Sequence, residues 1–135
     1  MSRYIIVFLL ATIGLASCTK KDVSQLTDSQ KTSRIEGSWR ITLFTEKNGS
    51  ETHDFSGYTF DFAKDGSFNA AVSGQGYEGT FTFGKDDGLD RIFVSISGTS
   101  DLDELTDDWV LNKLESKNMI WLDDSGSERV EWQKQ

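Results

Sequence analysis

Apolar and polar residues alternate with a period of two from about residue 37 onward, and short clusters of glycine, asparagine and aspartate interrupt the alternation. Successive side chains of an extended strand point to opposite faces, so this pattern predicts strands with one buried face. Residues 58–62 and 68–72 are clear examples, separated by a Lys-Asp-Gly turn. Asp-Gly pairs favour tight hairpins because these turns need positive φ. The pattern therefore predicts antiparallel strands joined by hairpins.

The runs number eight and are evenly spaced along the chain, at 39–43, 58–62, 68–72, 77–83, 92–96, 109–114, 119–122 and 128–133. Short turns join most of them, and we interpret the connection 98–108 as the loose one. Sequential hairpins suit a barrel better than a Greek-key sandwich, and closure also removes exposed strand edges. We expect an all-β fold, an eight-stranded antiparallel up-and-down barrel with at most one short helical turn.

The first 17 residues differ in character from the rest. Arg3 precedes an apolar run at Ile5–Ile13 that is too short to span a bilayer, and small residues follow it, which predicts an export signal over 1–17. Leu15–Cys18 resembles the lipobox of bacterial lipoproteins, which implies cleavage before Cys18 and a lipid on its sulfur. The alternative is an ordinary signal peptide with a free cysteine, but an exposed unpaired thiol is a liability in an oxidising compartment.

The segment 18–34 is polar apart from Val23 and Leu26, so we expect the lipidated cysteine and a polar tether there, followed by a single domain at 35–135. The formal net charge of −8, with no run of lysine or arginine, argues against a nucleic-acid partner. One histidine and one cysteine are too few soft ligands for a zinc site. We therefore expect no cofactor, no metal and no nucleic acid.

Three short motifs carry a family resemblance: Gly37-Ser38-Trp39 at the start of the first strand, Trp109-Val110-Leu111, and Val130-Glu131-Trp132. Together with the leader, they make the chain similar to small lipocalin-like lipoproteins of Bacteroidetes-type bacteria. The resemblance implies a calycin-like barrel in which Trp39 closes one end, with Arg129 or Lys134 stacked on its indole. It also implies a membrane-anchored protein of the bacterial cell envelope, and we expect the outer membrane.

Aromatic side chains dominate the predicted inner face, and they have two interpretations. They line a cavity for a small ligand, or they fill a barrel that is only just wide enough for its own side chains. Gly79 marks a place where space could remain, or else a bulge. In the later strands either Trp109 with Leu111, or Val110 with Leu114, faces inward. The candidate lining residues are Trp39, Tyr58, Phe60, Phe68, Tyr77, Phe81, Trp109 and Trp132.

The connection 98–108 is expected to form a flap over one barrel end, with Leu102 and Leu105 facing the opening, either as a gate or as a plug. Five carboxylates between residues 101 and 108 could hold Ca²⁺, although EF-hand spacing is absent. A helical turn capped by Ser100 explains the same residues.

We expect no enzyme, because His53-Asp54 is the single His–carboxylate pair and is interpreted as a solvated pair in a loop. A hydrolase that uses carboxylates such as Asp61 or Glu78 is a third hypothesis, which we do not favour. The first hypothesis is a lipid-anchored envelope protein that binds a small apolar or amphipathic molecule in the barrel or at its mouth. The alternative is a non-catalytic interaction module with a packed barrel that engages another envelope protein or a glycan. Phe44 and Phe93 motivate the alternative, since both are out of phase and predict an exposed apolar spot.

Overall fold

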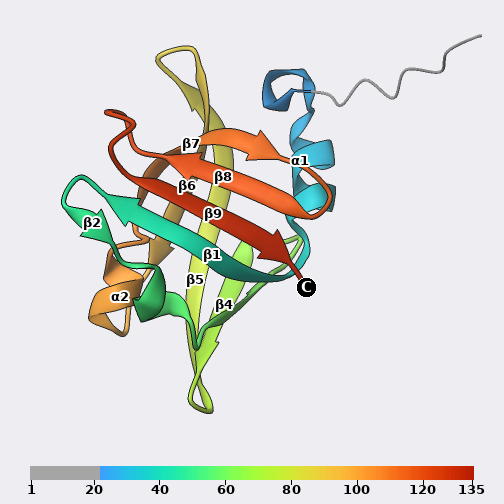
Figure 1. The fold of residues 1–135 in the computed structure, drawn as a ribbon. Coiled ribbons are helices and arrows are strands. Elements are labelled where there is room, and N and C mark those ends of the chain that lie inside the picture. Colours follow the sequence, from blue (N-terminus) through green and yellow to red (C-terminus); the bar gives the residue numbers. More distant parts are fainter. Residues whose placement is uncertain (1–21) are drawn as a thin grey trace, which may run out of the picture.

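The computed structural model describes residues 22–135, which form a β-barrel (Figure 1). Nine strands make one antiparallel sheet in the order β2-β1-β3-β4-β5-β6-β7-β8-β9, and β1 also pairs with β9. That last pairing closes eight strands into a ring, while the two-residue strand β2 lies outside it as an addition to β1. Neighbours in the ring are neighbours along the chain, so the predicted up-and-down barrel is confirmed.

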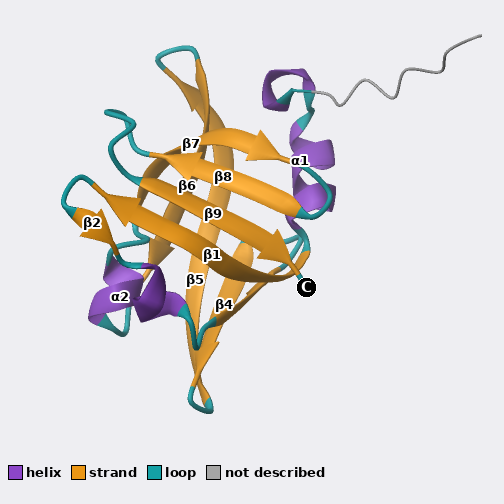
Figure 2. Ribbon diagram, in the orientation of Figure 1, coloured by secondary structure: helices purple, strands orange, loops and turns teal. Residues whose placement is uncertain are grey.

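The strands span Gly37–Glu46 (β1), Gly49–Ser50 (β2), Thr59–Phe62 (β3), Ser67–Val72 (β4), Gln75–Asp86 (β5), Leu89–Ile96 (β6), Asp107–Leu114 (β7), Asn118–Leu122 (β8) and Arg129–Lys134 (β9). The helices α1 (Asp28–Ile35) and α2 (Ser100–Asp103) and the 3₁₀ turns η1 (Val23–Gln25) and η2 (Thr52–Phe55) complete the described elements (Figure 2). The sequence predicted at most one helical turn, and α1 goes beyond that prediction.

Two hairpins show why the strands turn where they do. The β5–β6 loop consists of Asp87 and Gly88, with φ values of 52° and 75°. The β4–β5 loop consists of Ser73 and Gly74, with φ values of 50° and 78°. Positive φ at both residues of a two-residue loop is the type I′ geometry, whose twist matches that of the flanking strands. The Asp-Gly signal at β5–β6 therefore identified its turn correctly.

A bulge in β1 overturns the predicted exposed apolar spot. The pairing of β1 with β9 shifts register between Ile41 and Leu43. An extra residue in one strand moves the following side chains to the other face, so Phe44 lies in the core with no exposed surface. Phe93 is half-buried and lies against Gly84, where an added Cβ would come within 2.7 Å of the Phe93 ring. The prediction of an exposed Phe44–Phe93 patch was wrong.

The segment 22–34, predicted as part of a polar tether, packs on the barrel instead. Helix α1 begins at a capping box in which the Thr27 hydroxyl accepts from the Gln30 amide at 3.1 Å and the Gln30 side chain accepts from the Thr27 amide at 3.0 Å. Lys31 is only 3% exposed, and its Nζ donates to the Asp90 carboxylate at 2.9 Å. A lysine stem can cover apolar surface while its charge is paired, which hydropathy alone does not reveal.

The two helices lie at opposite ends of strand β7 and cover opposite ends of the barrel (Figure 1). On the α1 side, Arg34 donates to the Leu114 carbonyl at the end of β7, at 2.8 Å. On the other side, α2 leads directly into the start of β7, and Phe55 of η2 has no exposed surface. Short elements therefore close both openings.

A tryptophan in β1 and another in β7 each bond back to the segment that precedes their strand. The Trp39 indole donates to the Ile35 carbonyl at 2.7 Å, and the Trp109 indole donates to the Leu105 carbonyl at 2.8 Å. In both cases the acceptor lies four residues earlier in the chain. Lys134 Nζ lies 5.2 Å from the centre of the Trp39 ring, which confirms the expected cation contact for Lys134.

Candidate functional site

The predicted lining residues form the core of the barrel. Trp39, Phe60 and Trp109 have no exposed surface, and the others are at most 5% exposed except for Tyr77, which is half-buried. The rings also contact one another closely: Trp132 lies 4.9 Å from Phe60 and 4.6 Å from Trp121 between ring centres. Side chains that pack in this way fill the lumen, which supports the second of the two interpretations.

Two tryptophans in this core lack a hydrogen-bond acceptor. The indole N–H groups of Trp121 and Trp132 are buried and have no partner among the described residues. Trp39 and Trp109 are buried to the same extent, and their N–H groups are satisfied. A buried donor without an acceptor costs roughly 1–3 kcal/mol, so Trp121 and Trp132 carry a penalty that Trp39 and Trp109 do not.

The flap is pinned to the barrel. Leu102 and Leu105 have no exposed surface. The Thr106 hydroxyl accepts from the Ile96 amide at 2.9 Å and donates to the Ile96 carbonyl at 2.5 Å. Thr99, rather than the predicted Ser100, caps α2 by accepting from the Leu102 amide at 3.1 Å. This arrangement favours a plug over a gate.

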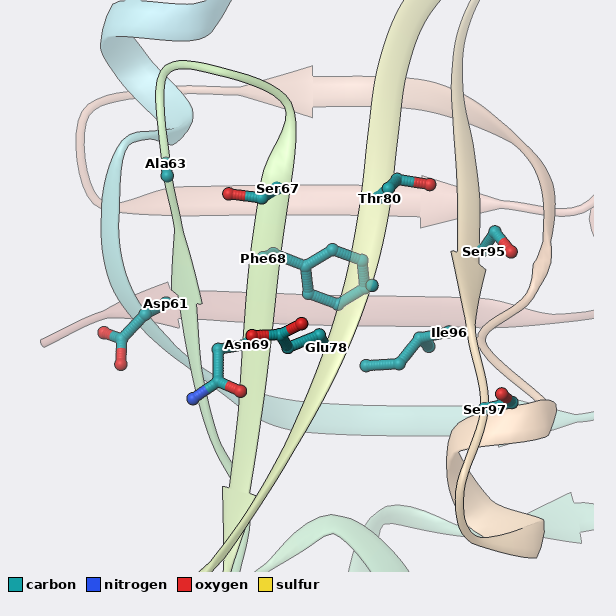
Figure 3. A pocket seen from close by; sticks show the side chains of 11 residues that line it. Asp61, Ala63, Ser67, Phe68, Asn69, Glu78, Thr80, Ser95, Ile96 and Ser97 are labelled. Carbon is teal, nitrogen blue, oxygen red and sulfur yellow. The ribbon is translucent and has the colours of Figure 1, made fainter.

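A groove of about 550 Å³ lies on the outer face of strands β3 to β6 (Figure 3). Its size falls within the range of small-molecule sites, roughly 300–1,000 Å³. The register places Ser67, Thr80 and Ser95 directly opposite one another on three neighbouring strands, which makes a row of hydroxyls. We call these three residues the hydroxyl row.

A second row runs beside the first. Asp61 pairs with Asn69, and Asn69 pairs with Glu78, so two carboxylates flank one amide on β3, β4 and β5. We call these three residues the carboxylate row. In Figure 3 the Glu78 side chain extends toward Asn69. The rows lie on alternate residues of each strand, so both face outward.

Most of these polar groups have no partner within the protein. Asp61 accepts from the Ser38 hydroxyl, and the Ser67 hydroxyl donates to Asp65 at 2.5 Å. Among the described residues no hydrogen bond reaches the side chains of the remaining row members, which are Asn69, Glu78, Thr80 and Ser95. The groove therefore presents hydroxyl, amide and carboxylate groups that are available to a ligand.

Gly79 lies in the wall between the groove and the core. An added Cβ would come within 2.7 Å of the Phe68 ring and of the Ser95 carbonyl, and within 2.8 Å of Ile96 Cβ. The space that the sequence suggested at Gly79 is therefore filled by core side chains. The glycine is needed because the core comes close to the backbone at this point of the wall.

Three glutamates meet at the α2 end of the barrel. Glu46, Glu51 and Glu104, here called the glutamate cluster, place one carboxylate oxygen each within 4.8 Å of the others. A hydrogen bond with Glu104 and burial raise the pKa of Glu51, and burial together with a hydrogen bond to Glu51 raises the pKa of Glu46. Such a cluster can share a proton or hold a hard cation. Among the described residues, Glu104 is the one member of the acidic segment 101–108 that joins such a group.

The remaining predicted sites lie elsewhere. His53 and Asp54 are exposed on η2, and no hydrogen bond joins their side chains among residues 22–135. Cys18, the predicted lipidation site, lies outside the described residues. No helix in the described part of the chain is long and apolar enough to cross a membrane.

Sequence reasoning did not identify the groove. Most of its residues are the polar positions opposite the core face of each strand, which are normally solvated. The sequence singled out Phe68 and Gly79 for the lumen, and Asp61 and Glu78 as carboxylates of a hydrolase that we did not favour. The small size of these residues could have indicated the groove. Short serine, threonine and asparagine side chains on adjacent strands leave a depression on the outer face of the sheet. The pairing register was needed to show that they line up.

No family of known proteins matches the sequence, and no curated protein matches it. Solved structures nevertheless share the fold. A lipocalin-like protein from Bacteroides uniformis matches with a TM-score of 0.57 at 14% identity, over 76% of this chain and 99% of that one. A DUF4847 family protein from Bacteroides vulgatus matches with a TM-score of 0.53 at 17% identity, over 76% of this chain and 96% of that one. The chain therefore has a lipocalin-like fold, as its motifs implied.

Proposed function

We propose that this protein is a lipid-anchored, non-catalytic binding domain of the bacterial cell envelope whose ligand, a glycan, lies in the outer groove. The observation that carries the proposal is the groove itself, with its two rows of largely unpartnered polar side chains. Aromatic rings fill the lumen, and helices close both of its ends. These features favour a packed module that binds on its outside over a barrel that holds an apolar ligand within.

The chemistry of the rows suits a hydroxyl-rich ligand. Serine and threonine hydroxyls both donate and accept, asparagine offers two donors and an acceptor, and carboxylates accept. A sugar ring presents several hydroxyls in a fixed arrangement, so two rows that lie two residues apart along each strand, about 7 Å, can contact more than one of them. Small residues along the groove leave room for the ring.

The anchor rests on the leader. The lipobox-like sequence ends at Cys18, and acylation there would attach the chain to the membrane, most stably with two or three acyl chains. Three residues separate Cys18 from Asp22, the first described residue, so at most roughly 14 Å of extended chain joins the anchor to the domain. We propose that the domain stands close to the outer membrane.

An NMR titration of the full chain in detergent tests the binding site. Cellobiose and N,N′-diacetylchitobiose are the probes, and we expect saturable shifts of backbone amide signals in both rows. Thr80→Arg should abolish the shifts by filling the groove. Thr82→Arg is the matched control, because Thr82 lies on the same strand and face but outside this groove.

Two results would refute this assignment. One is shifts confined to core residues, especially with binding of an apolar fluorescent probe, which would return the ligand to the lumen. The other is no binding of any saccharide by the unmodified chain, which would favour a protein partner.

A further inference from the structure

The charge of the groove is negative only. Asp61 and Glu78 line it, and no lysine, arginine or histidine does so. Lys64, in the β3–β4 turn, pairs with Glu36 at 3.6 Å. Within the described chain no ion pair reaches Glu78. An anionic ligand would thus meet like charge without a compensating cation.

The carboxylates of Asp61 and Glu78 differ in whether they already accept a hydrogen bond within the protein. Asp61 already accepts a hydrogen bond from Ser38, whereas the Glu78 carboxylate has no hydrogen-bond donor among the described residues. Glu78 pairs with Asn69 across β4 and β5, and its side chain extends toward that amide (Figure 3). Together they place a charged acceptor and a neutral acceptor within reach of one small donor group.

We propose that the groove selects an amino sugar that carries a free ammonium group, and that this ammonium binds between Glu78 and Asn69. This inference rests on the proposed glycan function. A primary ammonium carries three donors and a positive charge, so it can bond the Glu78 carboxylate and the Asn69 carbonyl together. The hydroxyl row then contacts the hydroxyls of the ring. The same negative charge excludes uronic, sialic, sulfated and phosphorylated sugars.

Calorimetry on the full chain in detergent tests the selection with three probes. They are a glucosamine disaccharide with free amines, the same disaccharide with both amines acetylated, and putrescine, a diamine without a ring. At mildly acidic pH, where the amines are protonated, we expect the free-amine disaccharide to bind about tenfold more tightly than the acetylated one. Putrescine should bind much more weakly than the free-amine disaccharide.

A pair of variants locates the effect. Glu78→Gln should remove the preference for the free amine and leave binding of the acetylated disaccharide unchanged. Asp86→Asn makes the same carboxylate-to-amide change on strand β5 but outside the groove, and it should retain the preference. Persistence of the preference in Glu78→Gln would overturn the assignment to that residue.

The possible results of the calorimetry distinguish a failure of the ammonium inference from a failure of the proposed glycan binding. If both disaccharides bind with equal affinity, the ammonium inference is overturned and the glycan proposal stands. If neither binds, both are overturned. If putrescine binds as tightly as the disaccharide, the site recognises amines without the sugar, and the inference is again overturned.

Discussion

The four buried tryptophans allow one chemical change to be compared in two environments. All four are at most 1% exposed, but the indole N–H groups of Trp39 and Trp109 are hydrogen-bonded and those of Trp121 and Trp132 are not. Substitution by phenylalanine removes the N–H and the same part of the ring at each site. The difference between sites in the loss of unfolding free energy therefore measures mainly the contribution of the indole hydrogen bond.

The expected magnitudes follow from the partners. Trp109→Phe leaves the buried Leu105 carbonyl without its 2.8 Å donor, which costs roughly 1–3 kcal/mol beyond the loss of ring volume. Trp121→Phe removes a buried donor that has no acceptor, which returns a similar amount and offsets part of the volume loss. We therefore expect Trp109→Phe to be more destabilising than Trp121→Phe by about 2–4 kcal/mol.

Urea titration and thermal melts of the two variants measure this difference, and a domain of this size shifts its melting temperature by about 4 °C per kcal/mol. The second pair, Trp39→Phe and Trp132→Phe, provides a replicate, with the Lys134 contact adding to the loss at Trp39. Equal destabilisation within both pairs would refute the reasoning, since it would mean that Trp121 and Trp132 have acceptors inside the barrel and that the lumen holds a polar molecule.

Further predictions concern the anchor, the N-terminal helix and the glutamate cluster. Cys18→Ser should release the protein from the membrane fraction, and its retention there would contradict the lipid anchor. Lys31→Ala leaves the Asp90 carboxylate buried without its cation, so urea titration should show a loss of about 3–5 kcal/mol, whereas an unchanged midpoint would mean that α1 does not stay packed. Because the pKa of Glu51 is raised above 4.5 in the folded state, the folded state binds protons more readily, and this group adds stability as the pH falls from neutral toward 4.5. Glu51→Gln should raise stability at neutral pH and flatten that dependence in melts across this range, and an unchanged slope would exclude the cluster as its cause.

Strand positions were predictable because the local signal and the global fold agree. Residues 58–62 and 68–72 alternate cleanly, and the structure places strands β3 and β4 there with the aromatic residues inside. The alternation failed where a bulge intervenes. The register shift between Leu111 and Lys113 lets both Leu111 and Leu114 face the core, so two predicted alternatives hold in different halves of one strand. Periodicity within a strand contains no information about an inserted residue.

The N-terminal segment shows a different limit. Residues 22–34 read as polar, yet Val23, Leu26 and Ile35 are spaced so that a short helix and a 3₁₀ turn bury all three. Lys31 completes that face, because its stem is buried and its charge meets Asp90. The spacing of these three apolar residues, together with the long apolar stem of Lys31, indicates that the segment packs on the barrel. The high average polarity of residues 22–34 obscured this pattern.

Some outward charged residues of other strands are paired, whereas within the described chain Asn69 and Glu78 in the groove are not. On β9 an outward pair, Arg129 and Glu131, satisfies itself at 3.1 Å, as does Lys113 with Glu115 at the end of β7, at 3.5 Å. Those outward residues serve the fold and its solubility. The outward residues of β4 and β5 include Asn69 and Glu78, which no such contact engages among the described residues. In the proposed function, these small polar residues would contact the sugar ring and the Glu78 carboxylate would contact its ammonium.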